Sequence, residues 1–184
     1  MKRYGAVPDD AFDTVFKMMQ QSFPREEYRD KPELKSLVYS KKLHVWGMYE
    51  EETLKAFLTY WLLPDAVFVE HFAVDSSCRG GGIGSAMIQK FVSQKKQPVT
   101  LEVELPETDI ARRRIAFYQR CGFYYNDFPY LQPPFREEDQ PLPLRVMSWP
   151  TPLTQERFIR LRQQAYQTVY GLSQQQALQY IIEP

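Results

Sequence analysis

The stretch from Phe68 to Val92, FVEHFAVDSSCRGGGIGSAMIQKFV, constrains the fold more than any other part of the chain. From Ala66 to Val74 nearly every residue is apolar or β-branched, which is typical of a strand covered on both faces. The glycines between residues 80 and 84 then let the backbone turn sharply. Apolar residues recur at helical spacing from Ile83 to Val92. The stretch therefore predicts a strand, a tight loop and a helix in direct succession.

A glycine-rich loop that leads into a helix can bind an anion. The first amide groups of a helix have no partner within it, and the helix dipole places partial positive charge there. Two common phosphate-binding motifs do not fit this loop. A Walker loop needs a lysine directly after its glycines, and none follows here. The dinucleotide fingerprint needs a third glycine where this chain has Met87. A surface turn with spare glycines is the alternative.

The pattern that remains is Arg-x-x-Gly-x-Gly, formed by Arg79, Gly82 and Gly84 directly after a hydrophobic strand. Further along, the sequence AFYQRCGF places Tyr118 four residues before the glycine that ends a predicted helix. The two patterns, in this order and with a predicted strand between them, resemble the acyl-CoA-binding signature of the GNAT superfamily of N-acyltransferases. The match is incomplete at Ala111 and Arg114, where the family often has asparagine and alanine. This difference weakens the expected side-chain contacts with the pantetheine arm, though not the backbone contacts.

The predicted elements follow the order strand, two helices, three strands, helix, strand, helix and two strands over the first 150 residues. This order predicts an α/β (α+β) fold with a central, mixed, mostly antiparallel sheet flanked by helices, and it matches the GNAT order. Pro150 and Pro152 mark a joint. We therefore expect a GNAT-like domain over residues 1–150 and a C-terminal helical extension over 151–184 that packs on the core or forms a dimer. The prolines between Phe128 and Pro143 argue against a regular element there.

The resemblance implies direct transfer of an acetyl or other acyl group from acetyl-CoA to a primary amine in a ternary complex. Backbone amides of the glycine loop would bind the pyrophosphate, while Arg79 adds charge or holds the loop in place. The pantetheine arm would pair with the end of the strand like an extra strand, and the amide of Val74 would stabilise the oxyanion. The implied cofactor-binding residues are Phe72, Ala73, Val74, Arg79, Gly80, Gly81, Gly82, Gly84 and Ser85.

Two residues are candidates for catalysis. The resemblance places Tyr118 as the general acid for the leaving thiolate; the alternative is a packed aromatic residue. Glu70 is a lone acid inside an apolar strand. Burial raises the pKa of a carboxyl group, which suits a general base, acting directly or through water. A paired structural acid, or one that only positions the amine, is the alternative. By strand alternation His71 points to the opposite face and is expected to be a satisfied core or interface histidine.

Composition excludes several other classes of function. Lys and Arg number 23, as do Asp and Glu, so the chain has no positive surplus that would favour nucleic acid. No apolar run is long enough to span a membrane, and the first ten residues lack a signal-peptide core, so we expect a cytoplasmic protein. Cys78 and Cys121 have neither the number nor the spacing of a disulfide framework or a metal site, and we expect no metal.

The acceptor amine cannot be identified from the residues, and the role of the extension is equally open. Two other functions therefore stay in view. One is a non-catalytic sensor that binds acyl-CoA without turnover. The other is an interaction module that uses the C-terminal helices, with a homodimer as one form. We favour the enzyme because Glu70 and Tyr118 are both present.

Overall fold

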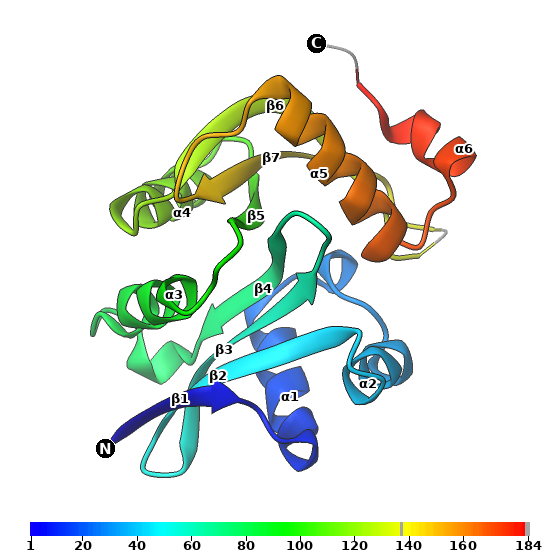
Figure 1. Cartoon of the computed structure of the whole chain (residues 1–184). Helices are drawn as coiled ribbons and strands as arrows, with labels where there is room; N and C mark the ends of the chain where they lie inside the picture. The colour runs from blue at the N-terminus through cyan, green and yellow to red at the C-terminus, as the bar shows by residue number, and fades with distance from the viewer. Residues whose placement is uncertain (137, 183–184) are drawn as a thin grey trace. The chain divides into compact units, whose positions relative to one another are not determined.

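The computed structural model describes residues 1–136 and 138–182. It divides into two compact units, Met1–Leu62 with Val69–Ser93 (unit 1) and Leu63–Phe68 with Gln94–Pro184 (unit 2). Figure 1 traces the chain. The strand order is β1-β2-β3-β4-β5-β7-β6, and the pairs β1–β2, β2–β3, β5–β7 and β6–β7 are antiparallel. Strand β4 (Val67–Val74) belongs to both units, because it begins in unit 2 and continues in unit 1. A mixed, mostly antiparallel sheet flanked by helices is the fold class that the sequence predicts.

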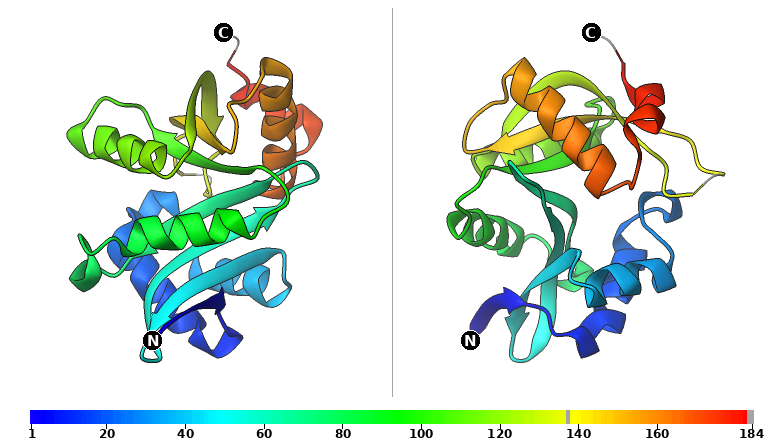
Figure 2. Two further views of the ribbon diagram at one scale, coloured as in Figure 1. Left: turned by 60° about the vertical axis from the view of Figure 1, so that its left-hand side comes forward. Right: turned by 45° about the vertical axis from the view of Figure 1, so that its right-hand side comes forward.

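Unit 1 contains a layer of strands between two layers of helices. Helices α1 and α2 cover one face of the strands and α3 covers the other (Figure 2). His71 on β4 contacts Phe23 at the end of α1, whereas Tyr60 on β3 contacts Phe91 of α3. The remaining elements of unit 1 are β1 (Lys2–Ala6), α1 (Phe12–Ser22), α2 (Lys31–Tyr39), β2 (Leu43–Glu50), β3 (Thr53–Leu62) and α3 (Ile83–Ser93), with 3-10 turns at Asp9–Ala11, Arg25–Glu27 and Ser76–Cys78.

The helices of unit 1 follow from their apolar periodicity. On α1, Val15 and Met19 lie one turn apart and are almost fully buried. On α3, Met87, Ile88 and Phe91 are fully buried and form its inner face. Burial of such an apolar face against a sheet stabilises a helix more than intrinsic propensity does.

Unit 2 joins three strands, a helix and the C-terminal extension. The hydroxyl of Thr108 accepts a hydrogen bond from the amide of Ala111 and caps α4, and Gly122, with φ 90°, follows its end. From α5 in the extension, Phe158 stacks on Phe128 with ring centres 4.8 Å apart. The elements are β5 (Val99–Glu104), α4 (Asp109–Arg120), β6 (Tyr124–Gln132), β7 (Leu142–Trp149), α5 (Gln155–Thr168) and α6 (Gln174–Ala177), with a 3-10 turn at Leu178–Tyr180.

The expectation of an irregular segment from Phe128 to Pro143 is wrong at both ends. Strand β6 continues through Pro129 to Gln132, and β7 already begins at Leu142. Proline is tolerated here because β6 is an edge strand whose register shifts between Asn126 and Tyr130. Pro143 lies where β7 is paired with β6 but not yet with β5.

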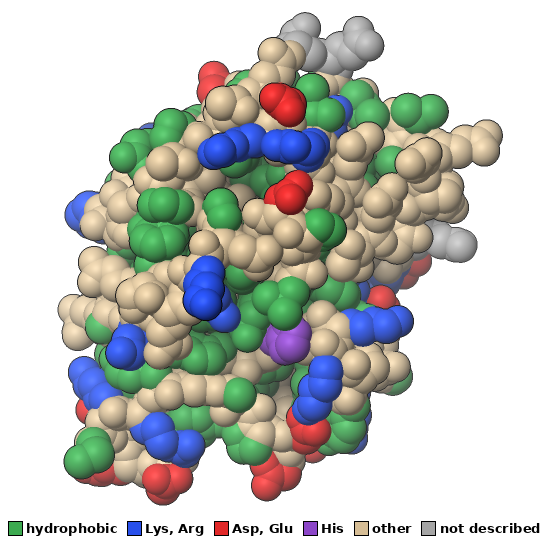
Figure 3. All heavy atoms as spheres, viewed as in Figure 1, with side chains coloured by type: hydrophobic (Ala, Val, Ile, Leu, Met, Phe, Trp, Pro, Cys, Tyr) green, Lys and Arg blue, Asp and Glu red, His purple; other side chains and the backbone are tan. Residues whose placement is uncertain are grey.

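The lengths of the helices and the charge of the surface can be compared with the expectations from composition. Within the described ranges, the helices are all too short or too polar to cross a bilayer. On the face shown in Figure 3, basic and acidic side chains are interspersed, and no large patch of one sign is visible.

Asn126 connects the strands of unit 2 to the start of the extension, and its loss should destabilise this unit. Its buried amide donates to Val146 O and Ser148 Oγ, each at 3.0 Å, and accepts from the amide of Leu153 at 2.7 Å. Asn126→Ala leaves these buried groups without hydrogen-bond partners. We therefore expect the free energy of unfolding, measured with urea, to fall by about 1–3 kcal/mol. The matched change Asp127→Ala removes an exposed ion pair with Arg145 and should cost less than about 1 kcal/mol. Equal losses would contradict this assignment.

Candidate active site

The glycine loop of unit 1 is built from the end of β4. The carboxylate of Asp75 accepts a hydrogen bond from the amide of Ser77 at 2.8 Å, which closes a turn directly after the strand. Arg79 Nε then donates to the carbonyl oxygen of Val74 at 3.3 Å. Arg79 therefore holds the start of the loop against the end of the strand, which is one of the two roles expected for it.

The two glycines with left-handed backbone are Gly80, with φ 84°, and Gly82, with φ 74°. A Cβ atom at either position would meet no heavy atom within 4 Å. Glycine is thus required here by backbone conformation and not by crowding, and the loop borders open space. Helix α3 follows at once, since the amide of Ala86 donates to Gly82 O at 3.0 Å. The succession of strand, glycine loop and helix is the one that the sequence predicts; a free helix N-terminus of this kind can bind an anion.

At the end of β4, partly exposed and buried side chains alternate. Phe72 and Val74 are partly exposed, whereas Ala73 between them is buried. The amide of Asp75 donates to Lys55 O on β3 at 2.9 Å. Because successive amides of a strand point to opposite edges, the amide of Val74 points away from β3. An extended group with amides of its own that paired with this side of β4 would lie next to the Val74 amide.

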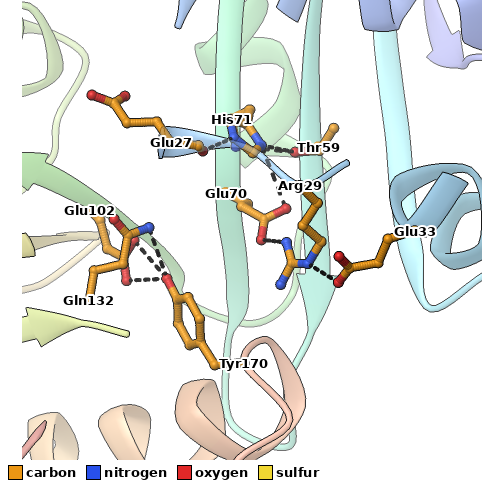
Figure 4. Close-up of polar contacts among 9 residues, drawn as sticks. All are labelled: Glu27, Arg29, Glu33, Thr59, Glu70, His71, Glu102, Gln132 and Tyr170. Atoms are coloured by element: carbon orange, nitrogen blue, oxygen red, sulfur yellow. Dashed lines mark hydrogen bonds and ion pairs between the residues drawn. The ribbon is translucent and has the colours of Figure 1, made fainter. Parts of the chain in front are cut away.

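Glu70 lies inside a buried ionic cluster (Figure 4). Its side chain is 1% exposed and is paired with Arg29, which is 3% exposed. Arg29 Nε also contacts Glu33 Oε1 at 3.1 Å, and the guanidinium lies 5.4 Å from the centre of the Trp61 ring. Arg29 comes from the segment between α1 and α2, whereas Glu70 and Trp61 come from β4 and β3. The cluster connects this segment to the strands.

His71 is the satisfied core histidine that the sequence predicts. Its Nε2 donates to Glu27 O at 2.8 Å, because a carbonyl oxygen can only accept, and its Nδ1 lies 3.2 Å from Thr59 Oγ1. The expected orientation is wrong, however. Nδ1 also lies 3.5 Å from Glu70 Oε2, and both side chains contact the segment between α1 and α2. Glu70 and His71 therefore point to the same side of the strand.

A bulge in β4 explains this orientation. Leu63 and Ala66 are paired at the turn between β3 and β4, and Asp75 bonds to Lys55 at the other end of the same hairpin. From Ala66 to Asp75 the chain advances one residue more than from Lys55 to Leu63, so β4 contains one extra residue. Such a bulge interrupts the alternation of side chains and redirects one of them.

The expected rise in the pKa of Glu70 is also wrong. Burial alone would raise this pKa, but the charge of Arg29, together with the neighbouring His71, outweighs it and lowers the pKa of Glu70 to about 2. A rise in pKa requires burial without a partner, whereas Arg29, which is 41 residues away along the chain, pairs with this carboxylate. The carboxylate is ionised at neutral pH and is a weak base.

Tyr118 belongs to unit 2 and is 7% exposed. Its ring packs edge-on against Phe123 at 5.6 Å, and burial raises its pKa above the ordinary value. Packing therefore accounts for the ring, and the raised pKa keeps the hydroxyl protonated at neutral pH.

The role of Arg29 and a polar cluster in unit 2 were not predicted from the sequence. The Tyr170 hydroxyl donates to the carboxylate of Glu102, at 3.0 and 3.1 Å from its two oxygens, and accepts from Gln132 Nε2 at 3.2 Å (Figure 4). Tyr170 comes from the extension, so periodicity marks it only as one more apolar position. For Arg29 a signal existed, since a lone acid inside an apolar strand needs a cation. No spacing identifies which cation it is.

Comparison with known proteins assigns the family. The model of the Acetyltransferase (GNAT) family matches residues 10–123, which is more than half of the chain. A solved structure named "Putative acetyltransferase from GNAT family from Bacteroides thetaiotaomicron" is 32% identical, covers 93% of this chain and 99% of its own, and superimposes with a TM-score of 0.85. The chain belongs to the GNAT acetyltransferase family, as its two sequence patterns indicate.

Two more distant proteins are similar to this chain. "Putative acetyltransferase YjbC" of Bacillus subtilis (strain 168) is 23% identical over 159 residues, which is 84% of this chain and 80% of that protein. A Bacillus subtilis acetyltransferase, solved in complex with CoA, is 13% identical, with a TM-score of 0.58 and coverage of 80% of this chain and 97% of its own. At this identity the second likeness concerns the fold alone.

The low pKa of Glu70 predicts a particular pH dependence of stability. A carboxylate whose folded pKa is depressed stabilises the fold above its unfolded pKa, and this contribution is lost as the pH falls toward the folded value. The pKa of Glu70 is 4.5 in the reference state and about 2 in the folded protein. As the pH falls, the unfolding free energy of the wild type should therefore decrease relative to that of Glu70→Gln. We expect on the order of 2 kcal/mol between about pH 6 and about pH 3, measured by urea unfolding. Glu33→Gln, at a half-exposed site, should keep the wild-type profile. If the difference in unfolding free energy between Glu70→Gln and the wild type did not change with pH, the lowered pKa of Glu70 would be refuted.

Proposed function

We propose that the chain is an N-acetyltransferase that moves an acetyl group from acetyl-CoA to a primary amine by direct attack in a ternary complex. The observation that carries the proposal is the glycine loop at the start of α3, with left-handed Gly80 and Gly82, in a chain of the GNAT acetyltransferase family. This family uses acetyl-CoA. Amides from Gly80 to Ser85 supply donors for the pyrophosphate, and the helix dipole favours its charge.

The end of β4 binds the thioester arm in this proposal. The arm carries amide groups, which pair with the strand edge at Phe72, Ala73 and Val74 as an added strand would. The amide of Val74 points away from β3, as its neighbour's bond to Lys55 O indicates. It donates to the thioester oxygen as negative charge develops there. Loss of such an oxyanion donor costs about 2.7–4 kcal/mol in other enzymes.

Tyr118 completes the chemistry at the leaving group. The acceptor ammonium first loses one proton to water, because Glu70 is too weak a base to take it. As the free amine attacks the thioester carbon, the C–S bond breaks and the electron pair goes to sulfur. The nitrogen loses a second proton to water as the amide forms, and the tyrosine oxygen regains from water the proton that it gives to the thiolate. A protonated hydroxyl donates a hydrogen bond, and then its proton, to this thiolate. The raised pKa of Tyr118 keeps that proton in place at neutral pH.

Glu70 positions the acceptor amine, and this is the role we favour among those open to it. An anion with a pKa of about 2 attracts an ammonium group but has little tendency to take its proton. A non-catalytic acyl-CoA sensor is the alternative function. The ion pair of Glu70 with Arg29 favours it, because that pair would exist without any chemistry.

Acetyl-CoA binding tests the cofactor site. Calorimetry should show saturable binding to the wild type and at least about 100-fold weaker binding to Gly82→Glu, or about 2.7 kcal/mol. The carboxylate would repel the pyrophosphate, and the side chain would strain a left-handed residue. Gly171→Glu is the matched control, since Gly171 also has a positive φ and open space around it. Wild-type affinity in Gly82→Glu, or no binding by the wild type, would eliminate the proposal.

Turnover tests Tyr118. Tyr118→Phe keeps the ring and its packing but removes the hydroxyl, so acetyl-CoA affinity should be unchanged. The rate of thiol release in the presence of a primary amine should fall roughly 100-fold or more. Phe117→Leu, at the adjacent position of α4, controls for loss of aromatic packing. An unchanged rate in Tyr118→Phe would make this residue a packed aromatic only.

A further inference from the structure

Arg29 is a buried cation held by three other side chains of unit 1. It pairs with Glu70, contacts Glu33 at 3.1 Å, and lies over the ring of Trp61 at 5.4 Å. Its side chain is 3% exposed although it comes from the connecting segment between α1 and α2. Arginine is rarely buried to this extent without a paired anion.

Stability alone does not explain such a pair. Removing two charges from water costs several kcal/mol for each ion, and their attraction offsets this cost only with good geometry. An apolar pair of similar volume is often as stable or more so. We therefore infer that this buried ion pair serves to orient the carboxylate of Glu70.

The second oxygen of Glu70 shows what is being oriented. Arg29 donates to Oε1. Oε2 is buried and receives no hydrogen bond from any residue in the described part of the chain, and His71 Nδ1, at 3.5 Å, is only an electrostatic contact. A buried carboxylate oxygen without a donor is costly, and such groups in folded proteins call for a ligand, a water molecule or a catalytic role.

We propose that Arg29 is a positioning residue that holds Oε1 of Glu70 and thereby presents Oε2 to an N–H group of the acceptor ammonium. The proposal rests on the proposed function, because the ammonium is the acceptor of the acetyl transfer. The substrate is thus a protonated primary amine, and Oε2 of Glu70 accepts its hydrogen bond. Glu70 itself contacts Arg29 and His71. Arg29 in turn contacts Glu33 and Trp61, and His71 contacts Thr59.

A second contact ties the same segment to β4. Glu27 O accepts from His71 Nε2 at 2.8 Å, two residues before Arg29. The segment and Glu70 are thus held together at two points, one charged and one neutral. Loss of Arg29 leaves the neutral contact in place, so the effect on amine binding can be separated from loss of the fold.

The experiment uses butylammonium as the probe and follows the carboxyl carbon of Glu70 by NMR in the full chain. The variants are Arg29→Met, Arg29→Lys, and Arg25→Met, which removes a more exposed arginine of the same segment. We expect a saturable shift at Glu70 in the wild type and in Arg25→Met. Binding should be at least about 10-fold weaker in Arg29→Met and intermediate in Arg29→Lys. Acetyl-CoA affinity should be equal in all four proteins.

The double variant Arg29→Met/Glu70→Gln separates positioning from stability. It removes both buried charges, so its urea midpoint should return toward the wild type, while butylammonium binding stays weak. Recovery of both properties would overturn the proposal, as would wild-type binding by Arg29→Met or no shift at Glu70 in the wild type. Thiol release from acetyl-CoA with butylamine is measured separately. Absence of turnover with intact butylammonium binding would reject the acetyltransferase function and leave the role of Arg29 standing.

Discussion

A carboxylate inside an apolar strand must be paired or neutralised, and this requirement organises unit 1. Glu70 draws a cation from the segment between α1 and α2, and the same segment gives its Glu27 carbonyl to His71. The connecting segment is therefore held by the sheet at two points. Strand β4 ends at Val74, three residues beyond His71, and leads into the glycine loop. One strand thus supports the glycine loop, the amide of Val74 and the ionic cluster.

The fold was largely predictable from the sequence because it depends on local patterns. Apolar spacing located α3, the glycine four residues after Tyr118 marked the end of α4, and the glycine loop lay between a strand and a helix as expected. The proline-rich stretch was misjudged, because whether a strand tolerates proline depends on its place in the sheet. Edge position is a property of the assembled sheet, which no local pattern contains.

The site was predictable only in part, for the same reason. Gly82 and Tyr118 belong to patterns of a few neighbouring residues, which can be recognised from the sequence alone. The partner of Glu70 is far away in the chain, and its charge reverses the direction of the pKa shift. The bulge in β4 is equally invisible, since an extra residue shows only against the register of β3. Long-range pairing, and not residue type, decides both properties.

The hydrogen bonds before the glycines have a thermodynamic consequence. A run of glycines has the largest conformational freedom of any sequence, and an anion that ordered it would lose that entropy from its binding free energy. The bonds of Asp75 to Ser77 and of Arg79 to Val74 restrict the entrance of the loop before any ligand arrives. The first turn of α3 restricts its exit. The loop is therefore preorganised at both ends, and only its central glycines have freedom left to lose.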